Sequence, residues 1–202
     1  MQKSVMQKLV IATGNAHKLH EISTLLQPLG IEAVSQSVFN VPEADEPHVT
    51  FIENALAKAR HAARLTGLPT LADDSGICVH ALGGAPGVIS AIYAGEPRSD
   101  ARNNEKLLAG MQGVADRRAH YHCALVLLRH ADDPQPIIAE GQWHGVILEA
   151  ARGEGGFGYD PLFLDTTFNQ TVAEISTADK NQVSHRGQAL RALLERLRGE
   201  AL

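Results

Sequence analysis

The chain has 202 residues, of which 44% are hydrophobic and 20% are charged, and its formal net charge is −5. This composition is typical of a globular protein that can bury a substantial core, and it predicts one domain spanning residues 1–202. The negative charge excludes the basic stripe that a nucleic-acid surface needs, so we expect no nucleic-acid partner.

The apolar pattern excludes two further classes. No apolar run approaches the roughly 20 residues of a membrane span, and the start lacks the apolar segment of a signal peptide. Cys78 and Cys123 lie far apart in apolar runs, which predicts buried thiols in a reducing compartment. We therefore expect a cytoplasmic protein without a membrane partner. Because residues 6–8 repeat residues 1–3, we interpret residues 1–7 as a short N-terminal extension.

The first predicted elements are a strand over residues 8–13 and a helix that follows Gly14 and Asn15. Apolar residues then recur at helical spacing as far as Leu26, with Lys18 in the first turn. The start of such a helix offers backbone N–H groups and a favourable dipole to a phosphate. Strand–glycine–helix junctions are common, so this motif alone is a weak indication of function.

Residues 31–35 predict a second strand, and residues 39–49 an acidic loop. A long helix then begins after its N-cap Thr50 and ends at Gly67. Asn54 and Lys58 are four residues apart and share a face of this helix. Charged loops and helix lysines are usually solvated, so neither feature by itself predicts a site.

Residues 70–76 predict a short buried strand that ends in Asp73 and Asp74, followed by a turn at Ser75 and Gly76. Adjacent residues of an extended segment point to opposite faces, so only one carboxylate can face a given site. One hypothesis is a Mg²⁺ site, because this ion prefers carboxylate oxygens shared with substrate phosphates. The alternative is an Asx-turn that only closes the loop.

The middle of the chain predicts mainly sheet. After a Gly- and Pro-rich loop over residues 82–90, a helix is expected with Ser99 or Asp100 as its cap. A strand follows over residues 121–128, and residues 137–140 and 143–148 predict a pair of strands.

Residues 153–163 predict a glycine-rich loop with aromatic side chains. A flat base could stack on Phe157; alternatively, the aromatic residues anchor the loop to the core. Further on, residues 184–187 open a C-terminal helix. His185 and Arg186 would oppose the helix dipole there, which suggests that acceptors of a ligand offset the repulsion. Ten histidines lack zinc-site spacing, so we expect no zinc.

Six motifs in this order resemble the inosine-triphosphate pyrophosphatase family, over nearly the whole chain. The motifs are Thr13-Gly14-Asn15 with Lys18; Phe51-Ile52-Glu53-Asn54-Ala55 with Lys58; Ala72-Asp73-Asp74-Ser75-Gly76; Gly83-Gly84-Ala85-Pro86-Gly87; Gly156-Phe157-Gly158-Tyr159-Asp160-Pro161; and Ser184-His185-Arg186-Gly187. The resemblance implies an α/β fold with a mixed central sheet flanked by helices, elongated and two-lobed around a central nucleotide cleft. It also implies a homodimer.

The activity implied by the resemblance is Mg²⁺-dependent hydrolysis of ITP, dITP or XTP to the monophosphate and pyrophosphate, which removes such purines from the nucleotide pool. The implied catalytic residues are Asp74, Lys18 and Lys58. The implied metal ligands are Asp74 and, by spacing, Asp45, with Glu43 or Glu46 as alternatives. The implied substrate-binding residues are Thr13, Gly14, Asn15, Ala16, His17, Lys18, Ser75, Phe157, Gly158, Tyr159, Asp160, Lys180, His185 and Arg186.

The chain departs from the family pattern at three places. Ile92 stands where bacterial members typically have arginine, and Ile89 where an aromatic residue is common. Pro47 alters the acidic loop, and His17 replaces a frequent glycine. The changes at Ile92 and Ile89 and in the acidic loop leave an alternative open. It is a nucleotide-binding protein of the same fold with altered specificity or no turnover. The ranking of ITP, dITP and XTP does not follow from the sequence.

Overall fold

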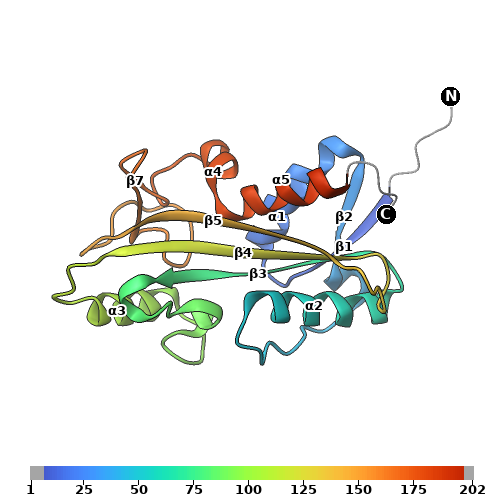
Figure 1. Ribbon diagram of the computed structural model, residues 1–202, viewed down its shortest axis with the longest axis horizontal. Coiled ribbons are helices and arrows are strands. Elements are labelled where there is room, and N and C mark those ends of the chain that lie inside the picture. Colours follow the sequence, from blue (N-terminus) through green and yellow to red (C-terminus); the bar gives the residue numbers. More distant parts are fainter. Residues whose placement is uncertain (1–6, 198–202) are drawn as a thin grey trace. The chain divides into compact units, whose positions relative to one another are not determined.

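The computed structural model describes residues 7–197 and shows an α/β protein with one mixed seven-stranded sheet in the order β2-β1-β3-β4-β5-β6-β7 (Figure 1). The predicted fold class is therefore confirmed. The strands are β1 (Gln7–Ala12), β2 (Ile31–Ser35), β3 (Thr70–Val79), β4 (Arg118–Leu128), β5 (Ile137–Ile147), β6 (Phe163–Asp165) and β7 (Gln170–Thr171). β1 pairs in parallel with β2 and β3, whereas β6 pairs antiparallel with β5 and β7.

Five α-helices are described, and most begin at a side-chain cap that the sequence supplies. They are α1 (Ala16–Leu26), α2 (Phe51–Thr66), α3 (Asp100–Gly110), α4 (Thr177–Val183) and α5 (His185–Leu197). The N-caps of the first four are Asn15, Thr50, Ser99 and Ser176, and each accepts a hydrogen bond from the first turn. Four 3₁₀ helices are η1 (Gln27–Leu29), η2 (Gln36–Phe39), η3 (His80–Leu82) and η4 (Gly87–Ile92).

The chain forms two compact units. Within the described residues, the first unit comprises 7–74, 124–140 and 189–197, and the second comprises 75–123 and 141–188. The prediction of a single domain stays a prediction. The predicted extension, residues 1–7, lies outside the described residues except for Gln7, which begins β1.

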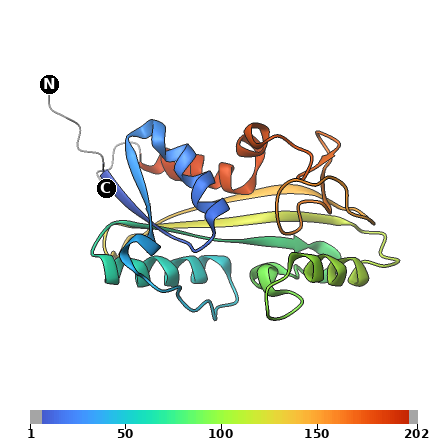
Figure 2. The ribbon, with the colours of Figure 1, turned by 180° about the vertical axis from the view of Figure 1, so that it is seen from behind.

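In the first unit, helices cover both faces of the sheet (Figures 1 and 2). Three alanines of α2, Ala55, Ala59 and Ala62, pack against Val10 of β1 and neighbouring strand residues. Small side chains let this helix approach the sheet closely. The alternate strand residues, such as Leu9, are also fully buried, and by strand periodicity they point to the opposite face, where α1 and the C-terminal half of α5 lie.

The second unit has its own core. It contains three aromatic residues in mutual ring contact, which are Tyr121 of β4, Trp143 of β5 and Phe163 of β6. Leu107 and Met111 attach α3 to the same cluster. This core supports the loop that precedes β6.

Several predicted elements need correction. The predicted strand end at Asp73 and Asp74 is wrong, and so are the turn at Ser75 and Gly76 and the Asx-turn alternative, because β3 continues to Val79. Charged partners described below hold both carboxylates, which lets polar residues remain in a buried strand. The predicted strand pair over residues 137–148 is one strand, β5. Helix α4 was not predicted, and Cys78, which was predicted to be buried, is only half-buried.

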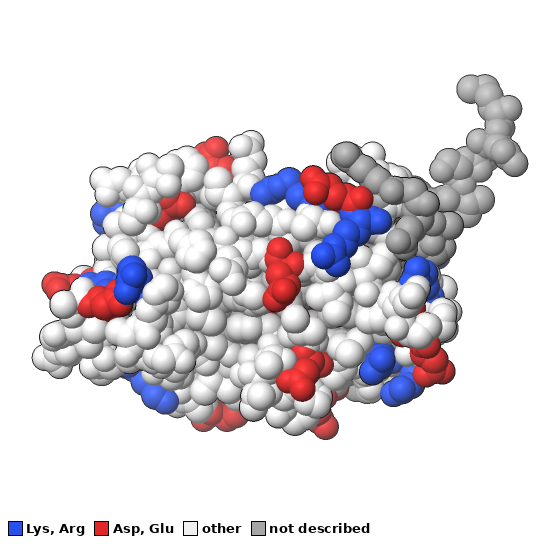
Figure 3. Space-filling model, in the orientation of Figure 1, with Lys and Arg blue, Asp and Glu red and all other residues white. Residues whose placement is uncertain are grey.

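The surface carries charges of both signs. On the face drawn in Figure 3, the side chains of Lys and Arg lie among those of Asp and Glu. None of the helices within residues 7–197 has the length and apolar character that a membrane crossing requires.

A buried carboxylate, Asp133, organises the connection between β4 and β5. Its oxygens accept hydrogen bonds from the Arg129 backbone and guanidinium and from the Gln135 N–H, at 2.9–3.1 Å. The bond with the Arg129 guanidinium lowers the pKa of Asp133 below its ordinary value. A carboxyl with a lowered pKa in the folded state stabilises the protein above the unfolded pKa, and this contribution falls as the pH drops.

We therefore expect Asp133→Ala to reduce the free energy of unfolding by about 2 kcal/mol at pH 7. The difference from wild type should shrink as the pH falls below about 4, because the unfolded chain takes up a proton there while the folded carboxyl stays ionised to a lower pH. Urea unfolding at pH 7 and pH 3 measures both values. An equal difference at the two pH values would contradict the assigned role of the ionised carboxylate.

Candidate active site

The first site feature lies where β1 and β3 run side by side. Ala12 pairs with Ala72 in parallel register, so the residues that follow these two positions leave the pairing at the same edge. After β1 these are Thr13 and Gly14, and on β3 they are Asp73 and Asp74. Ligands of α/β sheets bind at such carboxyl edges.

Asp74 is buried and is held by two residues of α2. Its Oδ1 accepts a hydrogen bond from Lys58 Nζ at 3.1 Å, and its Oδ2 accepts one from Asn54 Nδ2 at 3.4 Å. Lys58 Nζ also contacts Glu46 Oε2 at 3.0 Å. The four-residue spacing of Asn54 and Lys58 places both hydrogen-bond donors next to the Asp74 carboxylate.

The environment shifts the pKa of both charged groups. Burial raises the pKa of Asp74 to about 6, with Glu46 adding to the rise and with Lys58 and Lys18 opposing it. Burial alone would lower the pKa of Lys58, but the negative charges of Asp74, Asp73 and Glu46 outweigh it and raise the value. Asp74 is thus a carboxylate that has lost much of its hydration and would gain from contact with a cation.

Asp73 contacts a different helix, as its position on the strand predicts. Its Oδ2 lies 3.0 Å from Lys18 Nζ of α1, whereas Asp74 contacts α2. The expectation that the two carboxylates point to opposite faces is confirmed. Lys18, which was predicted to bind the substrate, is therefore paired with Asp73 in this structure.

The loop from Thr13 to Lys18 is a capped helix start. Asn15 Oδ1 accepts hydrogen bonds from the N–H groups of His17 and Lys18, and Thr13 Oγ1 accepts one from Asn15 N–H. The expectation of free N–H groups is wrong for these three positions, because side chains of the loop itself satisfy them. A phosphate would have to compete with these bonds or bind elsewhere on the loop.

Gly14 has a specific steric role in this loop. A β-carbon at this position would collide with the carboxylate of Glu43. The acidic loop therefore folds back onto the glycine, with Glu43 against the start of α1 and Glu46 against Lys58. Asp45, the metal ligand predicted by spacing, has an exposed side chain.

No group of three or more His, Cys, Asp or Glu side chains within residues 7–197 is arranged to hold a metal ion. The available oxygen ligands are individual carboxylates, chiefly Asp74 and the acidic-loop glutamates. That donor set fits Mg²⁺, which commonly uses one or two protein carboxylates and completes its shell with water and substrate phosphates.

In the second unit, β3 and α5 bring together residues that are 111 positions apart in sequence. Arg186, with 2% of its surface exposed, donates from Nη2 to Ser75 Oγ at 3.0 Å. The neighbouring His185 ring stacks on Tyr121 with a centroid separation of 4.9 Å. Ser184 accepts a hydrogen bond from Gly187 N–H and so caps the first turn of α5.

The loop containing Phe157 and Tyr159 is held mainly by Asp160. One oxygen of this buried carboxylate accepts from Tyr121 OH at 3.0 Å, and the other accepts from Phe157 N–H and Lys180 Nζ, both at 3.1 Å. Lys180 Nζ also lies 5.0 Å from the centroid of the Phe157 ring. Tyr159 is buried and donates to Ser90 O. The anchoring alternative therefore describes Tyr159 and Asp160, while Phe157 is only partly buried.

Sequence reasoning missed several residues of these clusters. Tyr121 was assigned only to a buried strand, yet it contacts both Asp160 and His185. Asp100 and Asn104 of α3 bond to the backbone of Gly158. A tyrosine hydroxyl next to the apolar half of this strand is the feature that could have indicated a buried hydrogen bond.

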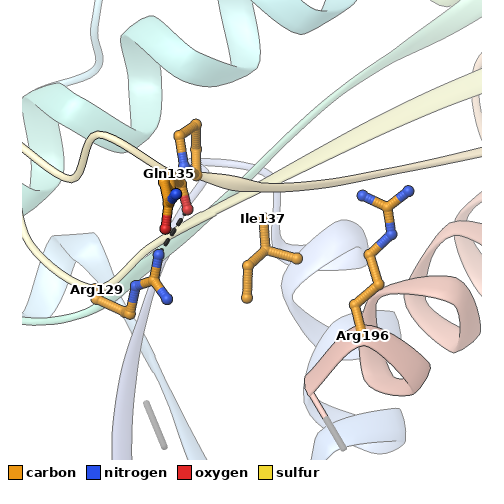
Figure 4. Close-up of a pocket in the computed structure, with 5 residues that line it drawn as sticks. Arg129, Gln135, Ile137 and Arg196 are labelled. Atoms are coloured by element: carbon orange, nitrogen blue, oxygen red, sulfur yellow. Dashed lines mark hydrogen bonds between the residues drawn. The ribbon is translucent and has the colours of Figure 1, made fainter. Parts of the chain in front are cut away.

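Two other features of the chain lie apart from these residues. His80, His120 and His144 form ring contacts on the second unit, and His120 has a lowered pKa because of burial and the neighbouring histidines. A pocket of about 300 Å³ on the first unit is lined by Arg129, Gln135, Pro136, Ile137 and Arg196 (Figure 4). Its two guanidiniums already donate to Asp133, Gln135 and Ile138, and it contains no predicted site residue.

Comparison with known proteins finds similar sequences over nearly the whole chain. A "dITP/XTP pyrophosphatase" from Ralstonia nicotianae is 62% identical over 196 residues, which cover 96% of this chain and 98% of that protein. A protein of the same name from Chromobacterium violaceum is 60% identical, with 98% of this chain and all of that protein covered.

Solved structures are similar as well. A HAM1 protein from Coxiella burnetii superposes with a TM-score of 0.91 at 45% identity, covering 96% of this chain and all of that one. The model of the Ham1 family matches residues 9–196. The chain therefore belongs to the Ham1 family.

Proposed function

We propose that this chain is a nucleoside triphosphate pyrophosphatase that hydrolyses dITP and XTP, and ITP as their close relative, to the monophosphate and pyrophosphate. The observation that carries the proposal is the dehydrated carboxylate Asp74 beside Lys58 and Asn54, at the sheet edge that also holds the loop after β1. The names of the 60–62% identical relatives support the same substrates.

The cluster in the first unit acts on the triphosphate in this proposal. Asp74 would hold Mg²⁺, and it is also the carboxylate assigned to accept the proton of the attacking water. Bound Mg²⁺ supplies neutralisation of phosphate charge. Lys58 orients Asp74, and Lys18 reaches the phosphates by exchanging its contact with Asp73.

The second carboxylate for the metal is a choice among three residues. All three residues are exposed, so exposure does not separate them, and Glu46 is already neutralised by Lys58. Glu43 lies directly on Gly14, in the loop assigned to the triphosphate. We therefore favour Glu43, although spacing in the sequence favoured Asp45.

The cluster in the second unit binds the nucleoside. The partly buried Phe157 ring offers a stacking surface, and Arg186 offers N–H donors to the 6-oxo group of hypoxanthine or xanthine. Adenine presents an amino group instead and would leave a buried donor unpaired, which can reduce kcat/KM by orders of magnitude. Tyr159, Asp160 and His185 are buried supports of these two groups.

Release of pyrophosphate from dITP, XTP, ITP, GTP and ATP in the presence of Mg²⁺ tests the proposal. We expect fast release from the first three and slow release from GTP and ATP. Release of single phosphate would assign the chain a different hydrolytic reaction. Binding without turnover would favour the alternative of a nucleotide-binding protein. That alternative was based on Ile92, which is 39% exposed on η4. The described residues give it no specific support.

Two finer predictions remain predictions. The resemblance implies a homodimer, which gel filtration would test. The apolar pattern and the cysteines predict a cytoplasmic location, which cell fractionation would test. Neither is needed for the assignment of roles within the two clusters.

A further inference from the structure

Two side chains of α3 form hydrogen bonds with the backbone of one glycine in the loop that contains Phe157. Asp100 Oδ2 accepts a hydrogen bond from Gly158 N–H at 2.7 Å, and Asn104 Nδ2 donates to Gly158 O at 3.0 Å. The two side chains are four residues apart and therefore share one face of the helix. They come from a segment more than 50 residues earlier in the chain.

These two bonds fix the backbone next to the Phe157 ring. The N–H of Gly158 belongs to the peptide that follows Phe157, and its carbonyl belongs to the next peptide. Gly158 has a φ of +61°, a conformation that side-chain-bearing residues rarely adopt. Together with the bond from Phe157 N–H to Asp160, both peptides of Phe157 and the one after Gly158 are held by side chains.

Asn104 is a poor choice for stability alone. Its Oδ1 is buried and has no hydrogen-bond partner, and an unsatisfied buried acceptor is destabilising. A leucine at this half-buried position would avoid that penalty. The amide is therefore explained by what its Nδ2 does, which is to bind the Gly158 carbonyl.

We infer that Asp100 and Asn104 are positioning residues for substrate recognition: they hold the backbone around Gly158 so that Phe157 presents its ring to the purine base. This inference rests on the proposed role of Phe157 in base binding. In this inference the base contacts are uniform, which means that they stabilise the ground state and the transition state alike. Loss of uniform binding raises KM and leaves kcat nearly unchanged.

The test compares Asn104→Leu with Glu105→Leu, which adds the same side chain at an exposed position of α3. We expect Asn104→Leu to raise the KM for dITP roughly three- to tenfold, the equivalent of one lost hydrogen bond. Its kcat and its inhibition by inorganic triphosphate, which has no base, should match wild type. Its Tm should be no lower than that of wild type. Glu105→Leu should change none of these values.

A second pair of variants guards against a folding defect. Asp100→Asn retains an oxygen acceptor for Gly158 N–H and should keep KM close to the wild-type value, whereas Asp100→Leu should raise it. A fall in kcat and Tm without a change in KM would show that α3 only stabilises the unit, and would overturn the inference.

Phe157→Ala separates this inference from the proposed function. If Phe157→Ala raises KM but Asn104→Leu and Asp100→Leu do not, the positioning role is wrong and the base-binding role stands. If Phe157→Ala leaves the KM for dITP unchanged, the base-binding role itself fails, and the positioning role fails with it.

Discussion

Asp74→Asn should lower the rate of pyrophosphate release from dITP by roughly 10²- to 10⁴-fold, the range found when a general base is removed. The substitution keeps the shape of the side chain and its contact with Asn54. It removes the negative charge proposed to bind Mg²⁺ and the oxygen proposed to accept a proton. Lys58 would also lose its ion pair with residue 74 and would keep only the one with Glu46 among these two. Steady-state kinetics with a pyrophosphate-specific detection assay measures the rate.

Asp133→Asn provides the matched control. Asp133 is as buried as Asp74, belongs to the same unit and also contacts a cation, Arg129. The control should lose stability without losing activity per folded molecule. If both variants retain activity close to wild type, Asp74 is not the catalytic carboxylate. If both lose it equally, the effect of Asp74→Asn reflects folding of the first unit.

The positions of these two carboxylates illustrate what the sequence could predict. Strand periodicity alone placed Asp73 and Asp74 on opposite faces, and helix spacing placed Asn54 and Lys58 together. Both expectations are confirmed by the contacts with Lys18 and with Asp74. Such local geometry follows from backbone repeats of 2 and 3.6 residues, which do not depend on the rest of the fold.

Partners that are distant in sequence could not be predicted in this way. Asp73 and Asp74 would end an isolated strand, but the lysines from two helices stabilise them, and β3 continues through them. Tertiary contacts also bring Arg186 to Ser75, and they bring α3 to the backbone of Gly158. Local pattern contains no information about such pairs, and the role of Asp160 as an anchor was missed for the same reason.

Asp160→Ala should lower the free energy of unfolding by about 3–5 kcal/mol, the range for removal of one partner of a buried ion pair. Only 4% of Asp160 is exposed, and its two oxygens satisfy Tyr121 OH, Phe157 N–H and Lys180 Nζ. The variant removes all three bonds and takes this carboxylate away from the Lys180 ammonium. Urea unfolding at neutral pH measures the loss.

Asp165→Ala is the comparison that isolates the charge. Asp165 is equally buried in the same unit, but it accepts hydrogen bonds from the neutral donors Trp143 Nε1 and two backbone N–H groups. Its replacement should therefore destabilise less than that of Asp160. In the double variant Asp160→Asn with Lys180→Met, the charge of Lys180 is absent, and the combined loss should be smaller than the sum of the two single losses. Additive losses would mean that Asp160 anchors the loop through Tyr121 and Phe157 alone, with no contribution from its ion pair.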